Sequence, residues 1–278
     1  MLFRSKEMTA TDYLYIDSIY LRNIALGWLL SVQAYKIFVA HLLPSMLDAS
    51  VDVAEEREQL NAYDHILANS AFTRSYFINR IEWTKKLDIV QPYISPNQAL
   101  FAHKNNNKIA ILISNWLPNK QLDLFLKAVA LREISDNFYI YIYGDINMDA
   151  SYFSQCLSII HNSPVLSKVI QIKGVFQPDD MQTILDEADV MIDASNFETY
   201  GMAVAESIVS GLPVLSLGAG HVEQLMGQGK SMVCKSIDEL VDHMILFLQD
   251  KMILSLRPIH NIITDWQVFK SQLTPFLE

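Results

Sequence analysis

The chain has 278 residues, 51% of them hydrophobic, and a formal net charge of −10 at pH 7. This length and apolar fraction predict a folded protein with room for two domains, and the acidic balance argues against a nucleic-acid surface, which needs clustered Lys and Arg. The only cysteines, Cys156 and Cys234, provide neither a disulfide framework nor metal-ligand spacing, so a cytoplasmic location is expected.

The first 95 residues alternate short apolar strands with helices. Strands are predicted at 13–16, 37–40 and 65–68, and helices at about 20–34, 52–61 and 71–81. Residues 20–43 are rich in apolar side chains, but polar residues such as Arg22 and Lys36 interrupt the run of about 20 that a membrane-spanning helix needs. A buried helix followed by a buried strand is therefore predicted, with no signal-peptide layout before them.

A link between two lobes is predicted at 90–97, which holds two prolines and no helical periodicity. Beyond it, strands are predicted at 109–114, 138–143, 169–173, 190–193, 214–217 and 232–234, with helices at about 121–132, 150–161, 179–187, 202–210, 221–227 and 237–249. Continuous apolar strands separated by helices predict a parallel sheet whose ligands bind outside the carboxyl ends of the strands. Residues 262–273 are predicted to form an amphipathic helix that stops near Pro275.

The most informative segment is 193–214, where an apolar strand runs through a polar loop into a helix. Glu198 lies in the loop, Glu206 lies one turn into the helix, and Gly201 stands between them at the helix start. Free N–H groups and the positive end of the helix dipole suit an anion, and a glycine lets the backbone approach a ligand closely. Because carboxylates accept hydrogen bonds from hydroxyls, this pattern suits a sugar that is bound through a phosphate.

Residues 198–206, read as Glu-Thr-Tyr-Gly-Met-(x)3-Glu and followed by Gly-Leu-Pro-Val, resemble the Glu-x7-Glu signature of retaining glycosyltransferase family 4. A bare pair of glutamates arises often by chance, whereas the pair within this strand–loop–helix context is specific. The resemblance covers nearly all of the chain from about residue 11 onward. It implies an α/β fold of the GT-B type, with two Rossmann-like parallel-sheet lobes and a nucleotide-sugar donor.

The resemblance also divides the chain into parts with separate roles. It implies a partial N-terminal acceptor lobe at 1–94, a donor-binding lobe at 95–255, and a C-terminal helix at 256–278 that packs back toward the first lobe. The family's acceptor lobe usually opens with a strand and a glycine-rich loop, which residues 1–11 do not show. About 95 residues are few for a whole lobe, so the expectation is a fragment or a reduced lobe.

Donor-binding roles follow from the resemblance alone. It implies Glu206 on the ribose, Glu198 near the transferred sugar, and the N–H groups of Tyr200, Gly201 and Met202 on sugar hydroxyls or phosphate. The alternative for both glutamates is a solvated helix face.

Further candidate residues lie in three loops that resemble the family. Lys120 matches a lysine that binds the donor diphosphate, although Ser114-Asn115 stands where Gly-Arg is usual and Gln121 stands where Gly is usual. Asn115 is as readily a turn or cap residue as a donor ligand. The remaining candidates are Gly174 and Val175, before the helix that holds the nucleobase, and His41, in a loop that faces the donor sugar.

His41 is expected to donate a hydrogen bond to the sugar, the alternative being an ordinary local hydrogen bond. No Asp-x-Asp occurs, so no metal is expected, and the phosphate charge would be met by Lys120 and helix N-termini. No cofactor is expected besides the donor substrate, and without a Gly-x-Gly-x-x-Gly the parallel sheet does not indicate a dinucleotide cofactor.

The expected activity is that of a hexosyltransferase in polysaccharide or glycoconjugate biosynthesis. It would move a sugar from a nucleoside diphosphate sugar to an acceptor hydroxyl with retention of configuration. The acceptor remains an unspecified glycan, lipid or other hydroxyl compound, and peripheral membrane contact stays open. Two alternatives remain: another reaction on the same fold, such as epimerisation or phosphorolysis, and a non-catalytic or truncated nucleotide-sugar-binding subunit.

Overall fold

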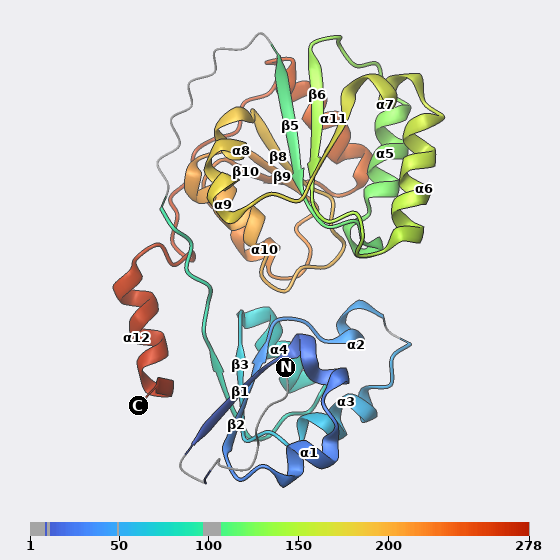
Figure 1. Cartoon of the computed structure of the whole chain (residues 1–278). Helices are drawn as coiled ribbons and strands as arrows, with labels where there is room; N and C mark the ends of the chain where they lie inside the picture. The colour runs from blue at the N-terminus through green and yellow to red at the C-terminus, as the bar shows by residue number, and fades with distance from the viewer. Residues whose placement is uncertain (1–8, 10–11, 49, 97–106, 278) are drawn as a thin grey trace. The chain divides into compact units, whose positions relative to one another are not determined.

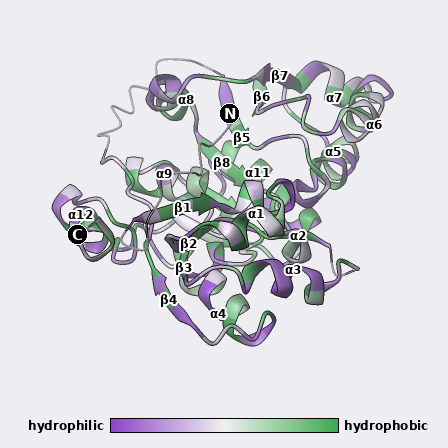
Figure 2. Ribbon diagram, turned by 60° about the horizontal axis from the view of Figure 1, so that its bottom comes forward, coloured by the Kyte–Doolittle hydropathy of each residue, from purple (hydrophilic) through white to green (hydrophobic). Residues whose placement is uncertain are grey.

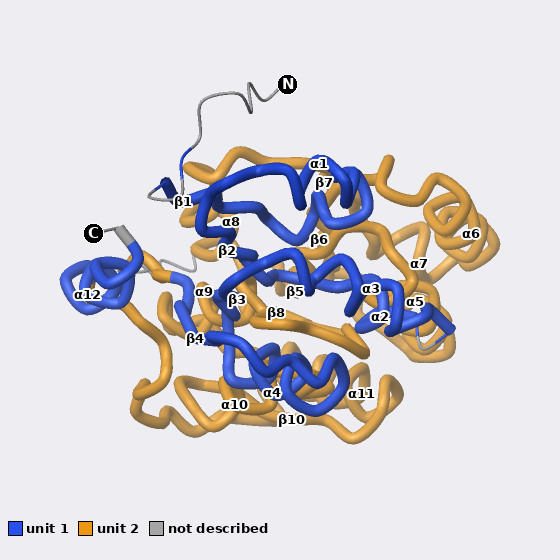
Figure 3. Tube along the Cα trace, turned by 90° about the horizontal axis from the view of Figure 1, so that it is seen from below, with its two compact units in different colours: residues 1–92, 266–278 blue, residues 93–265 orange. Residues whose placement is uncertain are grey.

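The computed structural model describes residues 9, 12–48, 50–96 and 107–277, which form two compact units. Unit 1 comprises Met1–Pro92 with Trp266–Glu278, and unit 2 comprises Tyr93–Asp265 (Figures 1 and 3). The first boundary falls inside the predicted link, and the C-terminal part of unit 1 begins at Trp266 rather than at residue 256. Asn97, and most of the residues in which a glycine-rich loop was sought before Asp12, lie outside the described residues.

Unit 1 is built on a four-stranded parallel sheet in the order β1-β2-β3-β4. Its strands are β1 (Tyr13–Asp17), β2 (Tyr35–Ala40), β3 (His65–Ala68) and β4 (Lys86–Ile89). Its helices are η2 (Ser18–Asn23, a 3-10 helix), α1 (Leu26–Ser31), α2 (Pro44–Leu47), α3 (Val53–Leu60), α4 (Ala71–Asn79) and α12 (Trp266–Leu277).

Two predictions in unit 1 are wrong. The single helix expected at 20–34 is split, because Asp17 caps the 3-10 helix η2 by accepting from Ile19 N, and Ile24 is extended before α1 begins. Pro275 lies inside α12 and does not end it. The last turn is held from outside the helix, since Tyr15 Oη donates to the carbonyl oxygen of Phe276 and the Phe276 ring packs against His65.

Unit 2 is built on a six-stranded parallel sheet in the order β10-β9-β8-β5-β6-β7. Its strands are β5 (Lys108–Ile113), β6 (Phe138–Tyr143), β7 (Ile170–Gly174), β8 (Val190–Asp193), β9 (Val214–Ser216) and β10 (Ser231–Val233). Its helices are η3 (Pro118–Lys120), α5 (Leu122–Ala130), α6 (Ala150–His161), α7 (Pro164–Val169), η4 (Pro178–Asp180), α8 (Met181–Glu187), α9 (Met202–Ser210), α10 (Val222–Leu225) and α11 (Ile237–Leu248).

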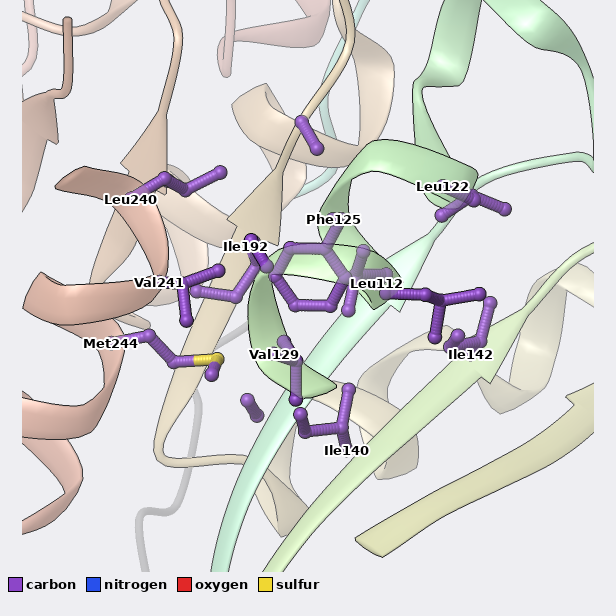
Figure 4. Packing of buried hydrophobic residues seen from close by; sticks show 14 of the residues in the cluster. Leu112, Leu122, Phe125, Val129, Ile140, Ile142, Ile192, Leu240, Val241 and Met244 are labelled. Carbon is purple, nitrogen blue, oxygen red and sulfur yellow. The ribbon is translucent and has the colours of Figure 1, made fainter. Parts of the chain in front are cut away.

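The core of unit 2 lies on both faces of this sheet. On one face, Phe125 and Val129 of α5 and Met244 of α11 pack against strand residues such as Leu112 and Ile192 (Figure 4). On the other face, α8, α9 and α10 contribute a second buried cluster. The predicted parallel sheet covered on both faces is therefore confirmed, and its carboxyl ends are the edge at which a ligand is expected.

No helix in the described part of the chain is long and apolar enough to cross a membrane.

Candidate functional site

The loops after β8 and β9 are joined through Asp193, the last residue of β8. Ser216 Oγ donates to Asp193 Oδ2 at 2.7 Å, and Ser195 N donates to Asp193 Oδ1 at 3.1 Å. Gly218 N then donates to Ser216 Oγ at 2.9 Å. This buried network fixes the start of both loops at the carboxyl edge of the sheet.

Lys120 and Glu198 form an ion pair at this edge. Lys120 Nζ contacts Glu198 Oε1, and Ser195 Oγ donates to the same oxygen at 3.1 Å. The two side chains are only 18% and 20% exposed. Burial raises the pKa of Glu198, and the positive charge of Lys120 opposes that rise. A hydrogen bond of 2.9 Å from Asn196 N to the carbonyl oxygen of Asn119 ties the two loops together.

Helix α9 begins beside this pair with no side-chain cap. Its N-cap, Gly201, has a φ of +87°, and a Cβ there would lie 2.5 Å from Val222 Cγ2. Glycine is therefore required both by the backbone and by packing. Met202 is 42% exposed at the first helical position, so the start of α9 lies at the surface of unit 2.

Glu206 is a half-buried carboxyl group one turn into α9. Its side chain forms no hydrogen bond or ion pair with any residue that the structure describes. Burial raises its pKa from the ordinary value of 4.5 to about 7. A carboxyl group that titrates near neutrality can accept a hydrogen bond from a hydroxyl in one state and donate one in the other.

His221, in the loop after β9, was not singled out as a site residue from the sequence, and the structure packs this loop against the Glu198 loop. His221 N donates to the carbonyl oxygen of Glu198 at 3.0 Å. A Cβ on Gly220 would lie 2.1 Å from that same oxygen. The His221 ring, 1% exposed, stacks on Tyr200 at 5.0 Å. The sequence signal that could have indicated this loop is the Gly-Ala-Gly run directly after an apolar strand.

Asn115 lies in the first loop of unit 2, directly after β5. Asn115 Oδ1 accepts from Asp145 N at 2.9 Å, so its amide oxygen is used to join the ends of β5 and β6. Gln121, where the family has glycine, has a φ of +50°. That left-handed conformation explains why glycine is usual at this position.

Gly174 and Val175 lie at the end of β7. Gly174 has a φ of +73°, and its carbonyl oxygen accepts from Gly144 N at 2.8 Å. Val175 is 69% exposed. An exposed apolar side chain at the carboxyl edge of the sheet can contact a flat ligand such as a base.

His41 belongs to unit 1, whereas the other predicted site residues belong to unit 2. Its Nε2 lies 3.2 Å from Asp17 Oδ2, and its side chain is 53% exposed. His41 N donates to Ser18 Oγ at 3.1 Å. His41 lines two cavities of unit 1, of about 530 and about 390 Å³.

Within residues 9, 12–48, 50–96 and 107–277, no group of three or more His, Cys, Asp or Glu side chains is arranged to hold a metal ion.

A family model described as glycosyl transferases group 1 matches residues 97–264, more than half of the chain. A search of curated proteins found no match.

Solved structures share the fold at low sequence identity. Sucrose-phosphate synthase from Thermosynechococcus elongatus has a TM-score of 0.72 at 11% identity, covering 95% of this chain and 72% of its own. HepE of Anabaena, crystallised with UDP and glucose, has a TM-score of 0.67 at 16% identity, covering 86% of this chain and 68% of its own. TarM of S. aureus, in a complex that includes UDP, has a TM-score of 0.63 at 17% identity; 79% of this chain is covered, and the chain spans 45% of TarM. These likenesses confirm the two-lobed, Rossmann-like GT-B fold.

Proposed function

The chain belongs to the family of glycosyl transferases group 1, and from that premise we propose that it transfers a hexose from a nucleoside diphosphate sugar to an acceptor hydroxyl with retention of configuration. The observation that carries the proposal is the contact of Lys120 with Glu198 beside the uncapped start of α9. It joins a cation, a carboxylate and free N–H groups at the ligand edge of a parallel sheet.

The proposed donor lies along this edge. Lys120 and the first N–H groups of α9 bind the diphosphate, and Glu206, which has no protein partner among the described residues, accepts from the ribose hydroxyls. Val175 and Gly174 contact the base. UDP is the nucleotide to test first, because HepE and TarM were crystallised with it.

In this proposal, donor binding begins by breaking the Lys120–Glu198 ion pair. Lys120 is bound to Glu198 in a largely buried setting. A diphosphate that takes over Lys120 leaves the Glu198 carboxyl group free to accept a hydrogen bond from the transferred sugar. Because burial raises the pKa of Glu198, losing the lysine favours its protonated form unless a sugar hydroxyl replaces that contact.

Catalysis in this proposal rests on charge and position. As the bond between sugar and diphosphate breaks, positive charge develops on the ring and negative charge on the leaving group. Lys120 and the α9 start stabilise the leaving group, and Glu198 orients the sugar. His41 donates a hydrogen bond to the sugar, and no protein-bound metal takes part.

The test is product analysis with UDP-glucose and UDP-N-acetylglucosamine. Release of UDP with an α-configured product, identified by NMR, is the expected result. The β anomer would contradict retention, and a chain that binds UDP yet neither transfers nor hydrolyses any donor would favour a nucleotide-sugar-binding subunit. Ser114-Asn115, in place of the usual Gly-Arg, is the feature that favours this second candidate.

A further inference from the structure

We propose that the larger cavity of unit 1 binds an acceptor that carries an apolar chain, with its hydroxyl-bearing head at the Asp17–His41 pair. The cavity measures about 530 Å³, within the range of small-molecule sites. It is lined by loop and helix residues that follow β1 and β2: Asp17, Ser18, Ile19, Leu21, Arg22, His41, Leu42, Leu43, Pro44 and Leu47. This inference rests on the proposed transferase function, which requires an acceptor.

The cavity lies where a parallel sheet binds its ligands. Its walls come from η2, which directly follows β1, and from the segment that follows β2 and leads into α2. Both segments leave the carboxyl ends of adjacent strands, the usual ligand edge of an open α/β sheet. The residues proposed above to bind the diphosphate, the ribose and the base of the donor all lie in unit 2, and His41 is the one proposed donor contact in unit 1. The rest of this edge of unit 1 is therefore left for the second substrate.

Helix α2, which belongs to the second wall of the cavity, is anchored by buried hydrogen bonds. Ser45 N donates to Glu56 Oε1 at 2.8 Å, Ser45 Oγ donates to Glu56 Oε2, and Tyr76 Oη donates to Ser45 Oγ at 2.7 Å. Helix α3 is otherwise largely hydrophilic, as Figure 2 shows, yet Glu56 is only 4% exposed. This buried anchor fixes α2, so the cavity is formed before a ligand arrives.

The walls are mostly apolar and partly exposed. Leu21 and Leu43 are buried in the floor, whereas Ile19 is 74% exposed and Leu47 is 45% exposed. Exposed aliphatic side chains that converge on one cavity favour an apolar ligand, because their contact with water is lost when it binds. A concave site of this kind fits an alkyl or prenyl chain better than it fits a flat protein surface.

Polar groups occupy the same cavity beside this apolar wall. Asp17 Oδ2 lies 3.2 Å from His41 Nε2, so the carboxylate orients the imidazole. Arg22 also lines this cavity, and its positive charge acts on Asp48; its guanidinium can in addition contact a polar head group. An amphipathic molecule, with a chain on the leucines and hydroxyls at His41, matches both halves of this lining.

The test compares two probes with one head group: octyl β-D-glucoside, kept below its micelle concentration, and methyl β-D-glucoside. Affinities of the full chain are measured by ligand-observed NMR, and UDP binding is measured separately by calorimetry. We expect the octyl compound to bind at least about tenfold more tightly than the methyl compound. Equal affinities would overturn the proposal.

Variants locate the binding. The double variant Ile19→Ser, Leu47→Ser is expected to weaken octyl glucoside at least about fivefold, with methyl glucoside and UDP unchanged. The matched control is Leu30→Ser, since Leu30 is 64% exposed in unit 1 and does not line the cavity. If this control lost as much octyl glucoside affinity as the double variant, the proposed site would be overturned. Binding of the chain to phosphatidylcholine vesicles is measured as well. If the control variant and the double variant reduced vesicle binding equally, the proposed site would also be overturned. If the chain bound octyl glucoside more tightly than methyl glucoside but did not bind UDP, the preference of the cavity for an alkyl chain would be upheld. The proposed binding of a nucleotide-sugar donor would then be overturned.

Discussion

The two units hold their candidate site residues in different ways. In unit 2, the Lys120–Glu198 pair is about four-fifths buried, and backbone hydrogen bonds tie the loops around it. Gly201 and Gly220 pack closely there, since a Cβ would lie 2.5 and 2.1 Å from a neighbouring atom. In unit 1, His41 and Asp17 are 53% and 39% exposed and stand beside an apolar cavity. A buried polar site must be fully specified by its neighbours, whereas an apolar cavity tolerates ligands of different shape. The five predictions below test this difference.

Gly220→Ala is expected to have the largest effect. A new Cβ would lie 2.1 Å from the carbonyl oxygen of Glu198, at a φ of +64°. We expect thermal unfolding to show a loss of about 3 kcal/mol, since both clash and backbone strain act there. Gly227→Ala is the control, because nothing lies within 4 Å of the new Cβ. If both variants were equally stable, the claim that glycines fix the unit 2 loops would be broken.

Lys120→Ala is expected to weaken UDP by about 30-fold and uridine by less than about threefold, because a charged hydrogen bond to phosphate is lost. Calorimetry with both ligands measures this. Lys127→Ala is the control. Lys127 is also paired with an acid, Asp123, but the Lys127 side chain is 51% exposed, so this variant should leave UDP affinity unchanged. Equal losses for uridine and UDP would contradict a phosphate role.

Glu206 is expected to make unit 2 less stable as pH rises. Burial raises its native pKa to about 7, above the ordinary value of 4.5, so between these pH values the folded chain keeps a proton that the unfolded chain releases. The free energy of unfolding should therefore fall across pH 4.5–7 and then level off. After allowance for partial exposure, about 2 kcal/mol is at stake.

Glu206→Gln should remove that part of the pH dependence, as measured by urea unfolding at several pH values. An identical pH profile in the variant and the natural chain would show that Glu206 is not the buried carboxyl group responsible.

Gln121→Gly is expected to stabilise the chain by about 0.5 kcal/mol, because Gln121 is held at a φ of +50° and glycine adopts that conformation without strain. Denaturant unfolding detects the gain. Gln177→Gly, at a φ of −82°, should instead reduce stability slightly. A loss at both positions would mean that the Gln121 side chain contributes more than its backbone strain costs.

His41→Ala is expected to change stability least, by less than about 0.5 kcal/mol, since the pair that it forms with Asp17 is exposed. Thermal unfolding of this variant tests the unit 1 half of the contrast. A loss above about 1 kcal/mol would show that His41 is a structural residue and that the contrast between the units is drawn too sharply.

Local signals in the sequence predicted the strands and helices of unit 2 well. Phe138–Tyr143, Val190–Asp193 and Met202–Ser210 were predicted to the residue, because apolar runs and bounding glycines mark them. Strand β4, Lys86–Ile89, was missed, since two of its four residues are charged and it is recognised only by its pairing with β3. Helices α2 and α7 were missed because each is short.

The candidate site was predictable only in part, because it depends on contacts between residues that lie far apart in the sequence. The motifs pointed to Lys120 and Glu198 separately, but their contact joins loops that are 78 residues apart. His221 acts through its backbone N–H and its stacked ring, neither of which a sequence pattern reveals. The apolar cavity of unit 1 depends on tertiary placement of Ile19 and Leu47, which alone read as ordinary surface residues.

The central claim is that unit 2 binds a nucleoside diphosphate sugar at the carboxyl edge of its sheet, with Glu206 on the ribose. The most direct measurement is a calorimetric titration of UDP-glucose into the natural chain and into Glu206→Ala, with thermal unfolding as the check on folding. We predict saturable binding by the natural chain, weakened at least about tenfold in the variant while the fold remains intact. Equal affinity in the two chains would contradict the site.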